Sequence, residues 1–222
     1  MNEKIEVIKL GFVNAFLMSV RDGFVLIDSG TAGQWGKLEG RLTAAGCLPD
    51  KLRLVIATHG DFDHTGNCAR LQRQYRAPIA MHEADAFMVE KGVMVDRIVR
   101  TFLGKLMILI AKWGNRRTPF DRFKPDVLLA DGQDMLAYGL PGRVIHIPGH
   151  TKGSVAVLTD EGSLIVGDTV ANMRKPALPL FVDDPEELKK SIDKLKRLAV
   201  QMVYPGHGTP FPAEAMVKVE PL

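Results

Sequence analysis

The stretch Thr58-His59-Gly60-Asp61-Phe62-Asp63-His64-Thr65-Gly66 places four side chains that can bind a metal within six residues. It follows Leu52–Thr58, a continuous apolar run with β-branched residues that predicts a buried strand. A glycine-containing loop between a strand and a helix can turn all four side chains toward one point. A single His or Asp in a loop is usually solvated or caps a helix. Two imidazoles and two carboxylates at this spacing instead predict a metal site, because zinc, manganese and iron all accept such ligands.

Three later segments share one format, in which an apolar run ends at a glycine and a potential ligand follows. These segments are Pro148-Gly149-His150-Thr151, Val166-Gly167-Asp168-Thr169 and Pro205-Gly206-His207-Gly208. One such segment could be an ordinary turn. Three of them, each at the end of a predicted strand, indicate loops that converge on the same site as the His59 loop, because loops above a rigid sheet commonly carry the functional residues.

Together these motifs resemble the metallo-β-lactamase superfamily, whose pattern is HxHxDH followed by a distant His, a distant Asp and a last His. Leu26-Ile27-Asp28-Ser29-Gly30 and the PGHTKGS segment at 148–154 are also typical of that family. The resemblance covers nearly the whole chain. It implies a single domain over residues 1–222 with an α/β fold, a four-layer αββα sandwich of two mixed sheets with helices on the outer faces.

The resemblance also implies a set of metal ligands. They are His59, Asp61 and His150 for a first ion, Asp63, His64 and His207 for a second, and Asp168 as a bridge between the two. Asp28 would orient the ligand loop from behind, although an Asp before Ser29-Gly30 is also an ordinary turn residue.

Asp61 departs from the family pattern, which usually has His at this position. A carboxylate adds negative charge and a harder oxygen ligand, which shifts the preference toward manganese or iron. We expect two divalent metal ions, with zinc first and manganese or iron as alternatives. Asp61 either binds the first ion or fails to reach it, which would leave that position weak or empty.

The function implied by the resemblance is that of a binuclear metal-dependent hydrolase. A hydroxide bridging the metals would attack an ester, lactone, thioester or related bond of a small-molecule substrate. Asp63 is the predicted catalytic residue, because it could orient the nucleophile or carry its proton. An iron-dependent oxidoreductase or a non-catalytic metal-binding protein of the same fold is the alternative. His82 and His146 are expected to be structural, since the ligand set is complete without them.

Short apolar runs and turn residues predict the remaining elements. Strands are expected at Ile5–Leu10, Ala15–Val20, Gly23–Asp28, Ala77–His82, Val144–Ile147, Ser154–Thr159, Ser163–Val166 and Met202–Tyr204. One helix is expected from about Thr65 to Tyr75. A second begins after Asp183 or Asp184 as N-cap, with Pro185 at its first position. Its apolar face is Leu188, Ile192, Leu195 and Ala199.

Residues 83–115 are predicted to be a helical insertion. Its broad apolar faces suit a lid over the site, core packing or a homodimer interface. The run Ile98–Trp113 within it is too short for a membrane span. The start of the sequence lacks the features of a signal peptide, and Cys47 and Cys68 form no disulfide framework, so a cytoplasmic protein with free thiols is expected. A net charge of only +3 does not favour nucleic acid as a partner.

Overall fold

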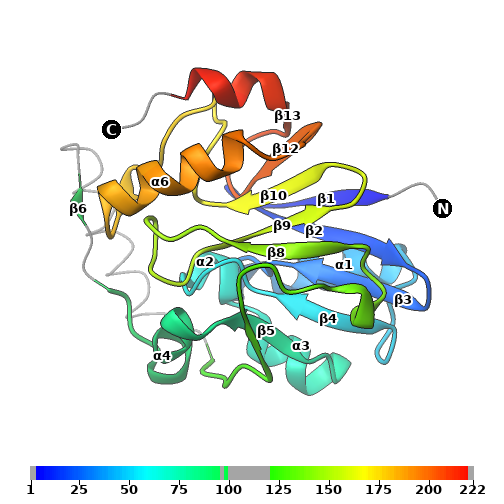
Figure 1. Ribbon diagram of the computed structural model, residues 1–222. Helices are drawn as coiled ribbons and strands as arrows, with labels where there is room; N and C mark the ends of the chain where they lie inside the picture. Colours follow the sequence, from blue (N-terminus) through cyan, green and yellow to red (C-terminus); the bar gives the residue numbers. More distant parts are fainter. Residues whose placement is uncertain (1–3, 96–97, 100–120, 220–222) are drawn as a thin grey trace.

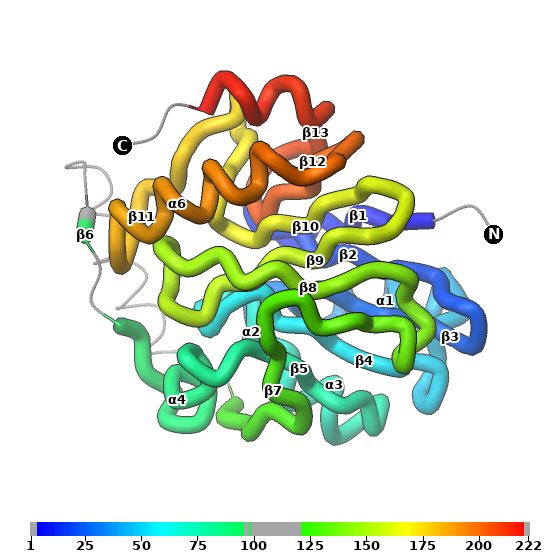
Figure 2. Tube along the Cα trace, in the orientation of Figure 1, coloured from blue at the N-terminus to red at the C-terminus, as the bar shows by residue number. Residues whose placement is uncertain are grey.

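The computed structural model describes residues 4–95, 98–99 and 121–219, and two β-sheets form its centre (Figure 1). The first sheet has the spatial order β1 (Ile5–Leu10), β2 (Val13–Val20), β3 (Gly23–Ile27), β4 (Leu52–Ile56), β5 (Ile79–His82) and β7 (Val127–Leu129). The second has the order β13 (Phe211–Pro212), β12 (Met202–Pro205), β10 (Ser163–Gly167), β9 (Val155–Thr159) and β8 (Gly142–His146). The chain therefore builds the first sheet with residues 5–129 and the second with residues 142–212, and these two segments are called its first and second halves below (Figure 2).

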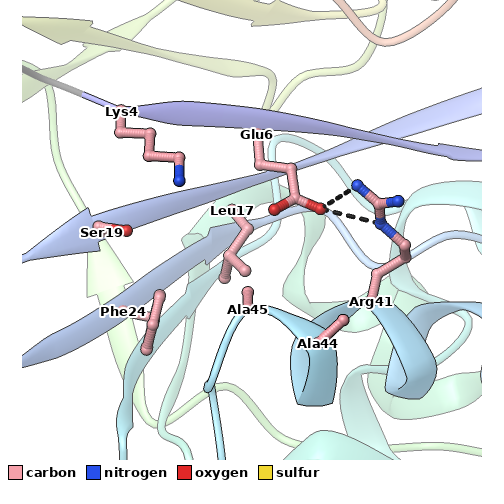
Figure 3. A pocket seen from close by; sticks show the side chains of 8 residues that line it. All are labelled: Lys4, Glu6, Leu17, Ser19, Phe24, Arg41, Ala44 and Ala45. Atoms are coloured by element: carbon pink, nitrogen blue, oxygen red, sulfur yellow. Dashed lines mark hydrogen bonds and ion pairs between the residues drawn. The ribbon is translucent and has the colours of Figure 1, made fainter.

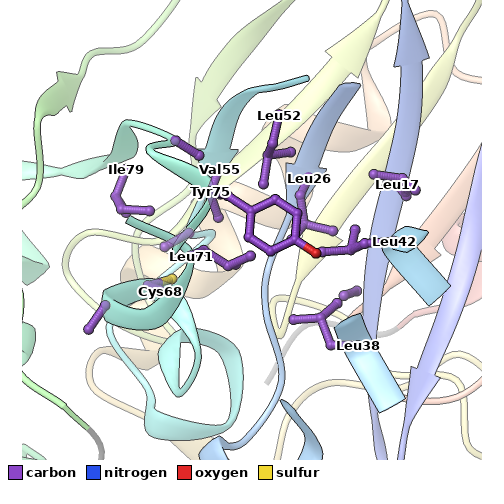
Figure 4. Packing of buried hydrophobic residues seen from close by; sticks show 14 of the residues in the cluster. Leu17, Leu26, Leu38, Leu42, Leu52, Val55, Cys68, Leu71, Tyr75 and Ile79 are labelled. Carbon is purple, nitrogen blue, oxygen red and sulfur yellow. The ribbon is translucent and has the colours of Figure 1, made fainter. Parts of the chain in front are cut away.

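Helices flank both sheets and fall into two groups. The α-helices are α1 (Trp35–Ala44), α2 (Phe62–Thr65), α3 (Cys68–Tyr75), α4 (Glu83–Lys91) and α6 (Pro185–Lys196), and the 3-10 helices are η1 (Ala32–Gln34), η2 (Leu136–Tyr138) and η3 (Ala213–Lys218). Buried side chains of α1, α3 and α4 pack on the first sheet, with Tyr75 among the leucines of that core (Figure 4). Buried side chains of α6 and η3 pack on the second sheet.

A third apolar core joins the two sheets face to face. Strand β2 shows how one strand serves two cores, because successive side chains point to opposite faces of a sheet. Ala15 and Leu17 pack toward the helices, whereas Phe16 and Met18 pack toward the second sheet. Three cores between four layers are the αββα sandwich that the sequence predicted.

Several predicted elements match closely, and α6 is the clearest case. Asp184 is its N-cap and accepts hydrogen bonds from the backbone N–H groups of Glu186 and Glu187, at 3.0 and 3.1 Å. Leu188, Ile192 and Leu195 are buried as expected. Ala199 lies beyond the helix, which ends at Lys196. The two cysteines are free and buried.

Two predictions about helices were wrong in part. The helix expected over Thr65–Tyr75 is split into α2 and α3, because the chain turns at Gly66 and Asn67. The insertion at 83–115 begins as the helix α4, but β6 (Ile98–Val99) is a short strand that pairs with β11 (Phe181–Val182). Residues 96–97 and 100–120 lie outside the described residues, as does most of the apolar run Ile98–Trp113. Within the described ranges, no helix has the length and apolar character needed to cross a membrane.

Candidate metal centre

The predicted ligands lie at the ends of strands that meet at one edge of the sandwich. β3, β4 and β5 run parallel in the first sheet, and β10 and β12 run parallel in the second. The carboxyl ends of parallel strands lie at the same edge of a sheet. The His59 loop follows β4, and Asp168 and His207 follow β10 and β12. His150 follows β8. The structure therefore brings all seven predicted ligands together.

The four histidines share one orientation of their rings, which leaves Nε2 facing the centre of the cluster. Nδ1 of His64 donates to the Asp28 carboxylate, at 2.8 Å. Nδ1 of His150 and of His207 donates to the backbone carbonyls of Phe181 and Phe12, each at 2.8 Å.

His59 has the same arrangement through a hydroxyl. Its Nδ1 lies 3.0 Å from the hydroxyl of Thr58, which in turn donates to the Asp28 carboxylate. A ring whose proton is held on Nδ1 presents the lone pair of Nε2. When neutral, all four imidazoles therefore keep their proton on Nδ1 and present Nε2 to a cation.

Distances within the cluster match those between ligands of a common ion. Asp61 Oδ2 lies 3.3 Å from His59 Nε2 and 3.3 Å from His150 Nε2. Two ligand atoms about 2.0 Å from a tetrahedral zinc ion lie about 3.3 Å apart. Asp61 thus reaches the other two members of its predicted set, although its side chain is shorter than that of His.

The other predicted ligands surround a second point. Asp63 Oδ2 lies 3.8 Å from His64 Nε2 and 3.6 Å from His207 Nε2. Asp168 lies beside both of these rings, with Oδ1 3.1 Å from His64 Nε2 and Oδ2 3.0 Å from His207 Nε2. Its Oδ2 is also 3.8 Å from His150 Nε2. Asp168 therefore occupies the position expected of a bridge between the two sets.

Unsatisfied buried atoms support a fit to metal ions. Among the described residues, His59 Nε2, His64 Nε2 and Asp168 Oδ1 are buried and make no hydrogen bond of acceptable geometry, although oppositely charged groups lie nearby. Buried polar atoms are nearly always satisfied in folded proteins. Three such atoms directed into one cluster of imidazoles and carboxylates are the donor set that a divalent transition metal requires.

The electrostatics of the cluster also favour a cation. Burial by itself lowers the pKa of His207, but the carboxylates of Asp168 and Asp63 outweigh burial and raise that pKa to about 9. His64 behaves alike: burial lowers its pKa, and neighbouring carboxylates, Asp168 foremost, bring it well above its usual value. Burial and the negative charges of Asp168 and Asp61 raise the pKa of Asp63. These raised pKa values show that the cluster of carboxylates binds protons to offset its negative charge, and bound metal ions would offset the same charge.

Asp28 combines the two roles considered for it. Its φ of 59° is a left-handed turn conformation, which Asp tolerates better than most residues. Its carboxylate is fully buried and accepts the backbone N–H of Thr58 at 2.8 Å as well as the His64 ring. The turn places the carboxylate within hydrogen-bonding distance of both Thr58 and His64 in the ligand loop.

His82 and His146 lie outside the groups of potential ligands found in the described residues. Their rings stack on each other with centroids 4.0 Å apart. Three other contributors escaped prediction, namely Asp85, the carbonyl of Phe12 and the carbonyl of Phe181. The position of Asp85, three residues after a predicted strand, is the one sequence signal that could have indicated it.

A separate cavity of about 230 Å³ lies between α1 and the strands β1 to β3 (Figure 3). It contains no predicted ligand. Its charged groups include Arg41, whose Nε donates to Glu6 at 2.9 Å, so these two neutralise each other. We therefore assign the chemistry to the His/Asp cluster.

Comparison with known proteins agrees with this geometry. The model of the metallo-beta-lactamase superfamily matches residues 8–207, and the chain belongs to that family. A probable metallo-hydrolase of Methanocaldococcus jannaschii is 30% identical over 188 residues, which cover 83% of this chain and 82% of that protein. Acyl-coenzyme A thioesterase MBLAC2 of Homo sapiens is 26% identical over 93% of this chain and 76% of its own length. These relatives support an enzyme.

Solved structures support the fold. A metallo-beta-lactamase family protein of Thermus thermophilus superposes with a TM-score of 0.73 at 21% identity, covering 97% of this chain and 76% of that one. The subclass B3 metallo-beta-lactamase BJP-1 of Bradyrhizobium japonicum gives a TM-score of 0.72 at 17% identity, over 97% of this chain and 86% of that one. At such identities the likeness concerns the fold alone.

Proposed function

We propose that this protein is a hydrolase that uses two divalent metal ions. The observation that carries the proposal is the common orientation of the four imidazoles, each with Nδ1 engaged and Nε2 directed at the carboxylates. One ion would be held by His59, Asp61 and His150 and the other by Asp63, His64 and His207, with Asp168 between them. Zinc suits these ligands, and the carboxylate of Asp61 also suits manganese or iron.

Bound divalent ions would supply a hydroxide nucleophile at neutral pH and polarise the bond to be broken. The protein's own groups then hold and move protons. Asp63 is the catalytic residue of the proposal, because its carboxylate lies among the predicted ligands, where it could orient the nucleophile or carry its proton. Asp28 and the carbonyls of Phe12 and Phe181 keep the ligand rings in the binding tautomer.

We propose an acyl substrate joined through a thioester, ester or lactone bond. Three exposed apolar side chains lie close to groups that support the ligand histidines. Phe12 is 59% exposed and stacks on His207, with ring centroids 5.7 Å apart. Leu180 is 40% exposed and precedes Phe181, and Met173 is 69% exposed and follows Asn172, whose N–H donates to the His207 carbonyl. Such side chains favour an apolar acyl group over a charged one.

Among these bonds, a thioester is our first choice. The relative MBLAC2 is an acyl-coenzyme A thioesterase and aligns with 93% of this chain. Its name describes that protein, and its similarity makes acyl thioesters the first substrates to test here.

The test is hydrolysis by the metal-loaded full chain of a panel of acyl-coenzyme A thioesters, aryl esters and lactones. We expect turnover that a chelator removes and that added zinc or manganese restores. His59→Ala should abolish turnover. His146→Ala is the matched control, because it removes a histidine outside the ligand groups. Two bound ions without turnover on the panel would instead support the redox or non-catalytic alternative.

A further inference from the structure

A second buried carboxylate, Asp85, contacts the ligand loops through hydrogen bonds. It lies in the first turn of α4, directly after β5, and its side chain is 1% exposed. It accepts three hydrogen bonds: from Gly60 N at 2.9 Å, from Thr151 Oγ1 at 2.7 Å and from Gly153 N at 2.8 Å. Three donors of this kind satisfy a buried, ionised carboxylate.

The donors belong to two loops that are far apart in the sequence. Gly60 lies between His59 and Asp61 in the loop after β4, which belongs to the first half of the molecule. Thr151 and Gly153 follow His150 in the loop between β8 and β9, which belongs to the second half. Asp85 therefore connects the two halves at the edge where the ligands lie.

The close approach depends on two glycines. A Cβ on Gly153 would lie 2.6 Å from Asp85 Cγ, and a Cβ on Gly60 would lie 2.8 Å from Met88 Sδ. Both distances are too short for real atoms. A Cβ at Gly153 would meet the Asp85 side chain itself, so the loop after His150 approaches this carboxylate as closely as a glycine allows, whereas at Gly60 the Met88 side chain can also move.

The same two loops supply the whole of the first predicted ligand set. His59 and Asp61 flank Gly60, and His150 precedes Thr151. The 3.3 Å separation between Asp61 Oδ2 and His150 Nε2 spans the gap between the two loops that Asp85 joins. The second set takes Asp63 and His64 from the first loop, but its third member, His207, is held through the carbonyl of Phe12 instead.

We propose that Asp85 is a positioning residue for the first metal: it fixes the separation of the two loops and so sets the affinity for the ion held by His59, Asp61 and His150. The proposal rests on the metal centre proposed above, but it does not depend on which bond is hydrolysed. A merely structural role would lower stability and weaken both sets alike. A positioning role weakens one set selectively.

The experiment is a zinc titration of the full chain, with affinities measured by competition against a chromophoric chelator. Asp85→Asn keeps the size of the side chain but removes its charge and turns an N–H donor toward one of the three donors. We expect two ions in the unsubstituted protein and a loss of about 10- to 100-fold in affinity for one of them, as for other residues that orient ligands.

Two backgrounds identify the affected ion. In His207→Ala, which damages the second set, adding Asp85→Asn should weaken the remaining ion by the same factor. In His150→Ala, which damages the first set, adding Asp85→Asn should leave the remaining ion unchanged. Such paired substitutions isolate the coupling between sites.

Val89→Ala is the control for stability, because Val89 lies on the same helix but is buried in the core beneath the first sheet. Its affinities should equal those of the unsubstituted protein. If Asp85→Asn does not fold, Thr151→Val removes one donor with little change in shape and should weaken the first ion by about two- to tenfold.

The possible failures are distinguishable. Equal weakening of both ions, or no weakening, overturns the role of Asp85 while leaving the metal centre intact. A failure of the unsubstituted protein to bind any zinc, manganese or iron overturns both the metal centre and this inference.

Discussion

Asp28→Asn is the substitution that most directly tests why the histidines point as they do. In the protein, the buried Asp28 carboxylate accepts the Nδ1 proton of His64 at 2.8 Å and the N–H of Thr58 at 2.8 Å. The introduced amide can still accept from Thr58 through its oxygen, but its N–H₂ then faces His64 Nδ1. The ring responds by moving its proton to Nε2, which removes the lone pair from the metal centre.

The expected loss can be estimated from that single bond. A hydrogen bond to a charged group contributes about 1.5–3 kcal/mol, which corresponds to about 10- to 160-fold in affinity. Because Asp28 is fully buried, water cannot replace the lost contact. We therefore expect zinc at the second set to bind about 10- to 100-fold more weakly.

The assay is chelator competition in the His150→Ala background, where the second set is the one left intact. Asp126→Asn is the control. The Asp126 carboxylate likewise accepts a backbone N–H, that of Ile79 at 2.8 Å, but Ile79 begins β5, at the end of the strand away from the ligand loops. An unchanged second-set affinity in Asp28→Asn would show that the carboxylate does not determine the tautomer of His64, and the reasoning about ring orientation would fail.

Two further predictions concern the ligands themselves. Asp61→His should raise the zinc occupancy of the first set, since a neutral imidazole replaces a hard oxygen ligand; unchanged stoichiometry and metal identity by elemental analysis would show that Asp61 is not a ligand. The metal-free protein should lose stability as pH rises from about 6.5 toward 9. The folded pKa of His207 is raised from 6.5 to about 9, so its contribution is complete below the lower value and is lost through the higher one. Urea midpoints across this range should fall with chelator but much less with zinc, and parallel curves would contradict the pKa assignment.

The ligand loops could be predicted from the sequence because each is a local event. An apolar strand ends, a glycine lets the chain turn, and a His or Asp follows at a short distance. Convergence of the loops then follows from parallel strands that share an edge. Whether the short Asp61 side chain would reach the first ion was left open by the sequence. The structure places Asp61 Oδ2 3.3 Å from both His59 and His150, which is a local matter of one loop and its neighbour.

Other features depend on contacts that no local pattern records. The pairing of Ile98–Val99 with Phe181–Val182 joins two strands of two residues, which are too short to show any periodicity. The break between α2 and α3 lies at Gly66 and Asn67, where the chain packs closely against residues 29–32. A Cβ on Gly66 would lie 2.5 Å from Ala32 N and 2.7 Å from Gly30 O. The role of Asp85 requires a helix to pack on two loops at once, so its carboxylate looks like an ordinary first-turn acid in the sequence.

The two buried carboxylates explain how one loop can serve two ligand sets. The chain from His59 to His64 is short, yet its ligands must face two different partners across the sandwich, His150 and His207. Asp28 holds the loop at both ends, through Thr58 and His64, whereas Asp85 holds it near its start, through Gly60. Because each carboxylate is anchored on the first sheet or on its helix α4, the loop is fixed at both ends relative to the first half of the molecule. Of the two carboxylates, only Asp85 also bonds to the second half, through Thr151 and Gly153. A change in the distance between the two sheets should therefore alter the metal affinity of the first ligand set more than that of the second.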